Sequence, residues 1–173
     1  MSSHLSSRGQ SGSSLGGGGG GGGGGGITVS ESTSVSPYAT SDNAIIVGAY
    51  ATEGAKSGEL AGFSSRGPVL VFPPGDARNL RPHLSAPGVA ITSALTGAEG
   101  GCCCDCCYDF YVNMQGTSQA APHVTGAVAL MLQKNPKLSF TQIRDILRNT
   151  ARPVAGQVLP NNDWGSGKLD VKA

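Results

Sequence analysis

The chain has 173 residues and a formal net charge of +1 at pH 7, and only 13% of its residues are charged. No basic stripe interleaved with aromatic residues runs along it, which argues against nucleic acid as a partner. No apolar stretch approaches the roughly 20 residues of a membrane span, and residues 1–15 lack the apolar core of a secretory signal peptide. We therefore expect neither a nucleic-acid partner nor a membrane partner.

The chain begins with a low-complexity segment that ends in eleven consecutive glycines, Gly16–Gly26. Nothing in a Gly/Ser-rich segment can offset the entropy lost on ordering it. We predict a disordered segment over residues 1–26 and one domain over residues 27–173. That length is enough for a single modest core.

Two short apolar runs predict strands in the middle of the chain. The first, Ala44–Ala49, follows the turn-prone Ser41-Asp42-Asn43, and the second, Val89–Ala94, follows Ala86-Pro87-Gly88. Continuous apolar runs of this length are typical of strands buried on both faces of a parallel sheet. The Pro- and Gly-rich stretches between them, 64–68 and 72–76, predict loops.

Five cysteines stand within six positions of a predicted loop over residues 100–108: Cys102, Cys103, Cys104, Cys106 and Cys107. Adjacent cysteines rarely reach disulfide geometry, and an odd number leaves one thiol over. Structural zinc sites usually draw on two distant pairs of ligands. The cluster is therefore either a low-complexity insertion with exposed thiols or a soft-metal or redox site.

Two helices are predicted after the cysteines. Residues 118–133 are rich in Ala and aliphatic side chains without Lys, Arg, Asp or Glu, which predicts a helix buried nearly all round. The second helix begins with Ser139 and Gln142 in the spacing of a capping box. It places its apolar face at Ile143, Ile146, Leu147 and Ala151. The rest of the chain, to Ala173, is predicted to be rich in loops.

Ser118 is the candidate for chemistry because it follows a Gly-Thr turn and opens the first helix, with Pro122 expected in the first turn. Backbone N–H groups at a helix start are unpaired and favour negative charge. A serine there can attack a carbonyl while its own N–H holds the developing oxyanion. The alternative is that Ser118 only caps the helix.

Residues 116–126 read Gly-Thr-Ser-Gln-Ala-Ala-Pro-His-Val-Thr-Gly. This string resembles the nucleophile motif of the subtilisin-like serine proteases, the subtilases, Gly-Thr-Ser-Met-Ala-Ala-Pro-His-Val-Ala-Gly, and departs from it only at Gln119 and Thr125. Further landmarks of the family are similar to residues 45–49, 63–68, 81–89 and 163–170, in family order. The resemblance covers residues 34–173.

The resemblance implies an α/β fold with a mainly parallel sheet flanked by helices, and hydrolysis of peptide bonds in proteins or peptides through an acyl-enzyme. Ser118 would be the nucleophile, with its backbone N–H in the oxyanion hole. The family's Asp and His motifs and its oxyanion Asn do not occur upstream of Ser118. His83 stands where the family commonly has an acidic residue, His123 is expected to be a packed, hydrogen-bonded residue, and Asn43 is in a structural position.

A serine without its base is a poor nucleophile. We therefore expect this chain to be the second part of a larger catalytic domain, to be nearly inactive alone, and to need the first part as a partner. The strand at Ile45–Ala49 would then lack a neighbour and expose an apolar edge, which predicts marginal stability or aggregation. The parent protein is expected to be secreted or compartmentalised, as in the family.

Two alternatives stay open: a non-catalytic pseudoprotease module, and a degenerate scaffold whose Cys-rich loop binds metal. We expect no cofactor. Calcium is implied only as a frequent property of the family, and no carboxylate cluster in the sequence supports a site for it.

Overall fold

A computed structural model describes residues 34–35, 40–94 and 111–172 of the chain. The predicted disordered segment 1–26 and the cysteine loop 100–108 lie outside these residues, so the interpretations of both stay predictions. The elements in chain order are β1 (Val47–Ala51), the short 3-10 helix η2 (Ala77–Asn79), β2 (Leu84–Val89), β3 (Ile91–Ala94), β4 (Tyr111–Met114), α1 (Thr117–Lys134) and α2 (Phe140–Asn149).

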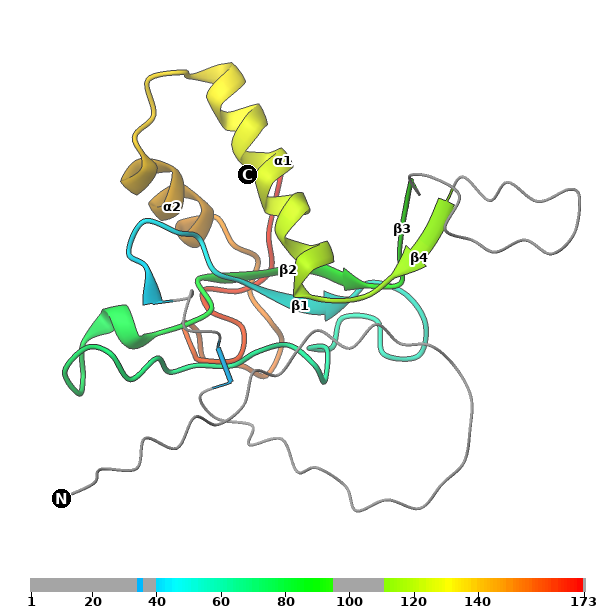
Figure 1. The fold of residues 1–173 in the computed structure, drawn as a ribbon, viewed down its shortest axis with the longest axis horizontal. Coiled ribbons are helices and arrows are strands. Elements are labelled where there is room, and N and C mark those ends of the chain that lie inside the picture. Colours follow the sequence, from blue (N-terminus) through cyan, green and yellow to red (C-terminus); the bar gives the residue numbers. More distant parts are fainter. Residues whose placement is uncertain (1–33, 36–39, 95–110, 173) are drawn as a thin grey trace, which may run out of the picture.

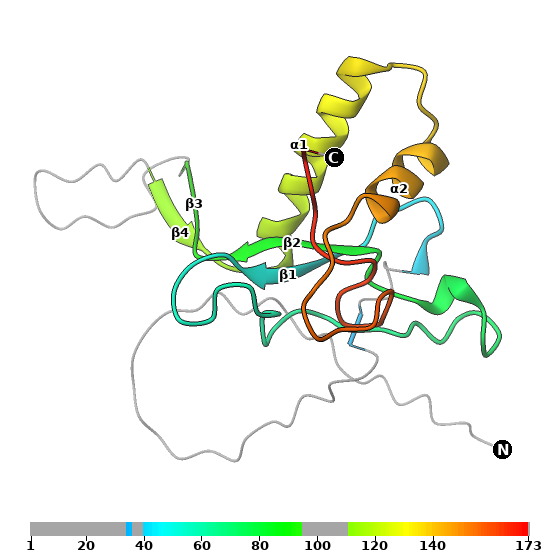
Figure 2. The same cartoon turned by 180° about the vertical axis from the view of Figure 1, so that it is seen from behind.

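The central pairing is parallel: β1 lies beside β2, with Val47 opposite Leu84 and Ala49 opposite Ala86. Helices α1 and α2 lie on the same side of this pair, and loops lie on its other side (Figures 1 and 2). The α/β class is therefore confirmed. The predicted strand positions are displaced, because β1 begins at Val47 rather than Ala44 and β2 begins at Leu84 rather than Val89.

The outer edge of β1 is covered along part of its length, contrary to the expectation of an open edge. The Ala61 N–H donates to the Ala49 carbonyl at 2.9 Å, and the Ala51 N–H donates to the Glu59 carbonyl at 3.0 Å. The Ser64 hydroxyl oxygen accepts the Ala49 N–H at 3.0 Å. The chain thus folds back along β1 and satisfies the groups that would otherwise invite edge pairing at Ala49 and Ala51.

One backbone conformation ends β2 and redirects the chain. Ala90 has a φ of 56°, in the left-handed region that residues with a side chain rarely adopt. Beyond it, β3 leaves the parallel pair and forms an antiparallel hairpin with β4, with Ile91 opposite Met114 (Figure 1). The predicted strand 89–94 is therefore divided between two sheets, and β4 was not predicted.

Helix α1 lies against β1 and β2 with one face only. Its buried side chains are Ala120, Val124 and Ala127, whereas Thr125 and Ala129 on the far side are exposed. The prediction of a helix buried nearly all round is wrong for this structure, because no other described segment packs on the far side. The far face of α1 is therefore uncharged although the described residues leave it uncovered.

Helix α2 closes the core from one end. Its predicted capping box is confirmed, since the Ser139 side chain accepts from the Gln142 N–H and the Gln142 side chain accepts from the Ser139 N–H. Ile143 and Leu147 are buried as expected, but Ile146 is 39% exposed and Ala151 lies beyond the end of the helix. The predicted loops at 64–68 and 72–76 and the loop-rich segment after α2 are also confirmed.

Candidate active site

Two glycines fix the start of α1 at the end of β2. The Gly116 N–H donates to the Gly88 carbonyl at 2.8 Å. A Cβ on Gly88 would meet the Gly116 carbonyl oxygen at 2.8 Å and the Cβ of Ala49 at 2.7 Å, so the helix can approach the sheet this closely only without a side chain there. The first turn of α1 is therefore held by backbone contacts to the central strand.

Gly116 is the N-cap of α1, with a φ of 154°. Its carbonyl accepts from the N–H groups of Gln119 at 3.1 Å and Ala120 at 3.3 Å. Ser118 is the second helical residue, so the alternative in which Ser118 caps the helix is wrong. Gly116 has no side chain to satisfy the first N–H groups, which leaves the helix start open to an external acceptor.

The Ser118 side chain is exposed at this helix start. Among the described residues, no hydrogen bond donated by its backbone N–H is recorded. The first turn of α1 carries no acidic residue that would occupy this position. An exposed hydroxyl beside a free N–H at the positive end of a helix dipole is an arrangement that can hold a developing negative charge.

The sequence had suggested that Pro122 lies in the first turn of α1, but the structure places it in the second turn. A proline there has no N–H to donate to the carbonyl four residues earlier, which is that of Ser118. The first two turns therefore meet at a point where the ordinary helix hydrogen bond is missing. Pro122 is itself exposed.

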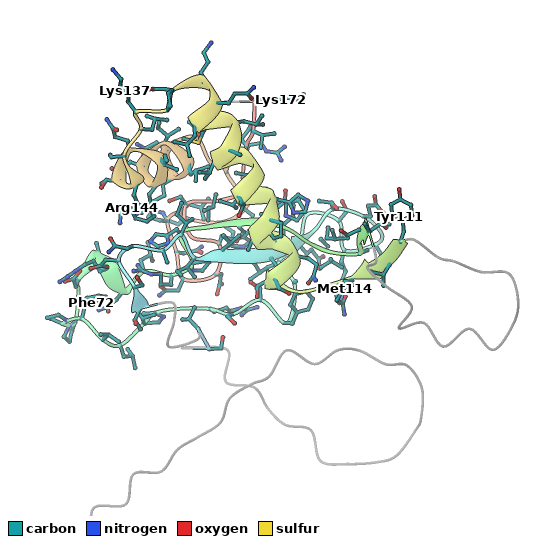
Figure 3. All side chains as sticks on the ribbon, turned by 45° about the horizontal axis from the view of Figure 1, so that its top comes forward. Phe72, Tyr111, Met114, Lys137, Arg144 and Lys172 are labelled. Atoms are coloured by element: carbon teal, nitrogen blue, oxygen red, sulfur yellow. The ribbon has the colours of Figure 1, made fainter. Side chains whose placement is uncertain are left out.

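The Ser118 hydroxyl has one recorded partner, the side chain of its neighbour Gln119. The hydroxyl donates to Gln119 Oε1 at 2.9 Å, and Gln119 Nε2 points to Met114 Sδ at 3.9 Å. Figure 3 shows Met114 at the end of β4 that leads into α1. Sequence reasoning noted Gln119 only as a departure from the family motif and did not single out Met114.

His83 is a structural residue. It is 5% exposed, its ring Nδ1 accepts the Ile46 N–H at 2.9 Å, and its backbone N–H donates to the Ile46 carbonyl at 2.8 Å. Burial, and then the nearby positive charges of Arg81, Arg148 and Arg144, lowers the pKa of His83 to about 3. It precedes β2, about 16 Å along the strand from the Gly88 end where α1 begins, so it cannot be the base for Ser118.

His123 does not reach Ser118 either. It is exposed rather than packed as expected, and its Nδ1 lies 3.0 Å from the carbonyl oxygen of Gln119, one turn back in the same helix. The hydrogen bond that the sequence suggested is therefore confirmed, and the packing is not. Asn43 is exposed near Ser41, whose hydroxyl oxygen accepts the Asn43 N–H at 3.2 Å.

No catalytic base is recorded at Ser118 in the part of the chain that the structure describes. Within the same residues, no three His, Cys, Asp or Glu side chains gather in a way that could hold a metal ion. Of two surface pockets, one of about 490 Å³ is lined by α2 and the segment after it, and one of about 430 Å³ is lined by the second half of α1, by α2 and by the C-terminal segment; neither includes Ser118. None of the described helices is long and apolar enough to cross a membrane.

Comparison with known sequences gives consistent relatives. The chain is 41% identical over 116 residues to the minor extracellular protease Vpr of Bacillus subtilis (strain 168), which covers 65% of this chain and 13% of that protein. It is 35% identical over 144 residues to Subtilisin BL of Lederbergia lenta, which covers 83% of this chain and 42% of that protein. The chain thus spans less than half the length of each of these relatives.

Solved structures are similar as well. The CspB protease of Clostridium perfringens matches with a TM-score of 0.64 and 31% identity, over 84% of this chain and 29% of that chain. Fervidolysin from Fervidobacterium pennivorans, described as a keratinolytic enzyme related to subtilisin, matches with a TM-score of 0.58 and 33% identity, over 78% of this chain and 19% of that chain.

The sequence model described as the subtilase family matches residues 14–167, which is most of the chain and includes the whole of α1. The parallel strands, the glycine-held helix start and the exposed serine all lie within that match. The chain belongs to the subtilase family of serine proteases.

Proposed function

We propose that Ser118 is the nucleophile of a serine endopeptidase site that hydrolyses peptide bonds in protein or peptide substrates. Its Oγ attacks the scissile carbonyl carbon, and its proton passes through a base to the leaving amine as the C–N bond breaks. Water then releases the acyl group from Oγ. The observation that carries the proposal is the exposed Ser118 hydroxyl at a glycine-held helix start, beside an N–H for which the described residues record no acceptor.

The base is supplied by a further polypeptide segment that docks against the uncovered face of α1. The exposed residues there include Ala121, Thr125, Gly126 and Ala129. A helix face that remains in water usually carries charged side chains. A Cβ on Gly126 would meet nothing within 4 Å, so no described contact accounts for a glycine that weakens the helix.

This docking segment corresponds to the part of the relatives that the chain does not span. By analogy with the extracellular protease Vpr, the assembled enzyme acts outside the cell or in a separate compartment. We propose no cofactor, because the chemistry of a serine nucleophile with a base requires none.

The test replaces the absent base with a small one. The full chain is incubated with a fluorophosphonate, which forms an Oγ–P bond as fluoride leaves, with and without added imidazole to take up the proton. Because the Ser118 side chain is exposed, imidazole can reach it. We expect slow labelling alone and faster labelling with imidazole, with the adduct mapped to Ser118 by peptide mass spectrometry.

Ser118→Ala should abolish the imidazole-dependent adduct, and Ser93→Ala, at an exposed serine of β3, should leave it unchanged. Labelling that imidazole does not accelerate, or that maps to other residues, would favour a pseudoprotease module in place of an enzyme.

A further inference from the structure

Gln119 occupies the third position of α1, and Gln142 occupies the same position of α2. In α2 the glutamine returns to the N-cap, where Gln142 Oε1 accepts the Ser139 N–H at 2.9 Å. In α1 the corresponding hydrogen bond from the N-cap to the glutamine side chain cannot form, because the N–H of the N-cap Gly116 already donates to the Gly88 carbonyl. The Gln119 side chain is thus released from the usual capping role of a glutamine at this position.

The released side chain turns to the candidate nucleophile instead. Gln119 Oε1 accepts the hydrogen bond of the Ser118 hydroxyl at 2.9 Å. A Cβ on Gly116 would meet Gln119 Oε1 at 2.7 Å and Ser118 Oγ at 3.0 Å, so the pair lies directly over the bare N-cap. The other end of the amide points to Met114 Sδ at 3.9 Å, which is a weak acceptor.

The direction of this hydrogen bond matters for the chemistry. A serine nucleophile reacts when its proton is directed at a base that can accept it. An amide oxygen accepts a hydrogen bond but does not take up a proton near neutral pH, so it cannot act as that base. While the Ser118 hydroxyl donates its hydrogen bond to Gln119 Oε1, its proton is directed away from any base that approaches.

We infer that Gln119 is a positioning residue that restrains Ser118. Its amide oxygen accepts the hydrogen bond of the Ser118 hydroxyl in the resting site, and this hydrogen bond must break before the serine can attack. This inference rests on the proposed role of Ser118 as nucleophile. Release breaks one neutral hydrogen bond, and among the described residues the amide is retained on its other side only by the sulfur contact. A restraint of this kind slows the nucleophile by about fivefold.

The test uses Gln119→Met, which keeps a long unbranched side chain with good helix propensity and removes the acceptor. The matched control is Gln133→Met, the same change at an exposed position near the other end of α1. Both variants are labelled with the fluorophosphonate in saturating imidazole over a range of probe concentrations. This separates the maximal rate of labelling from the probe concentration that gives half of it.

We expect Gln119→Met to raise the maximal rate at Ser118 by about fivefold with an unchanged half-saturating concentration, and Gln133→Met to change neither. A merely structural role for Gln119 would alter the half-saturating concentration or the thermal midpoint. Equal maximal rates for the wild type and Gln119→Met would overturn the restraint while leaving the nucleophile in place. Absence of an adduct at Ser118 in both proteins would overturn the nucleophile and the restraint together.

Discussion

At the scale of single residues, the environment of His83 makes the stability of the chain depend on pH. The His83 side chain is buried among Arg81, Arg144 and Arg148, and it accepts a hydrogen bond from Ile46 that requires Nδ1 to be unprotonated. Its pKa falls from the ordinary 6.5 to about 3 in the folded chain. The unfolded chain therefore binds a proton in a range of pH where the folded chain does not.

The sign follows from this difference. Between about pH 6.5 and pH 3 the unfolded state carries the extra proton, so the free energy of unfolding falls as the pH falls, by about 1.4 kcal/mol per unit. His83→Asn keeps an acceptor near the Ile46 N–H and removes the titration. Urea denaturation at pH 7.5, 5.5 and 4.5 should show that the free energy of unfolding falls more steeply with falling pH for the wild type than for His83→Asn. Parallel losses would contradict this account.

A second residue-scale prediction concerns Ala90. Its φ of 56° costs about 1 kcal/mol for a residue with a Cβ and little for glycine. Ala90→Gly should raise the free energy of unfolding by about 0.5 kcal/mol, after the greater entropy of glycine in the unfolded chain is counted. The matched control is Ala129→Gly on the exposed face of α1, which should lower stability by about 1 kcal/mol. Chemical denaturation measures both, and a loss at Ala90 would contradict the backbone interpretation.

At the scale of elements, sequence periodicity located α1 and α2 to within one or two residues but misjudged how α1 is buried. An uncharged helix is expected to be covered all round, and the pattern does not reveal whether the covering segments are among its own neighbours in the chain. The break at Ala90 was also not predictable, because alanine gives no signal for a left-handed backbone. Hairpin β3–β4 depends on that break.

The joint between β2 and α1 gives the element-scale prediction. Gly88→Ala would place a methyl group within 2.8 Å of the Gly116 carbonyl oxygen and 3.2 Å of the Ala120 Cβ. Backbone on one side and a helix on the other leave little room to relax, so we expect a loss of about 1 to 3 kcal/mol in the free energy of unfolding. Gly62→Ala, where a Cβ would meet nothing within 4 Å, is the control and should be nearly neutral. Equal effects would contradict the close approach of α1 to the sheet.

At the scale of the whole molecule, the nucleophile motif was visible in the sequence because its residues are contiguous. The Ser118–Gln119 hydrogen bond was not, since it depends on the Gly116 N–H being taken by Gly88, a residue distant in the chain. The base could not be found by either route within the described residues. What the fold adds is an uncovered face of α1, on which we propose that a segment carrying that base docks.

This docking can be tested with the part of Subtilisin BL that lies outside its match to this chain, expressed separately and mixed with the full chain. In the mixture, the fluorophosphonate should label Ser118 without added imidazole. Ala129→Arg, on the uncovered face, should abolish that gain and leave imidazole-dependent labelling intact, whereas Thr141→Arg on exposed α2 should change neither. If Ala129→Arg has no effect on the mixture, the segment does not dock on α1.

The central claim is that Ser118 is a nucleophile for which the described residues supply no base, and the rate of its labelling by a fluorophosphonate against the concentration of neutral imidazole tests it most directly. If the claim holds, the rate for the full chain rises with imidazole, the adduct maps to Ser118, and Ser118→Ala removes it. A rate that is independent of imidazole, or an adduct that persists in Ser118→Ala, would contradict the claim.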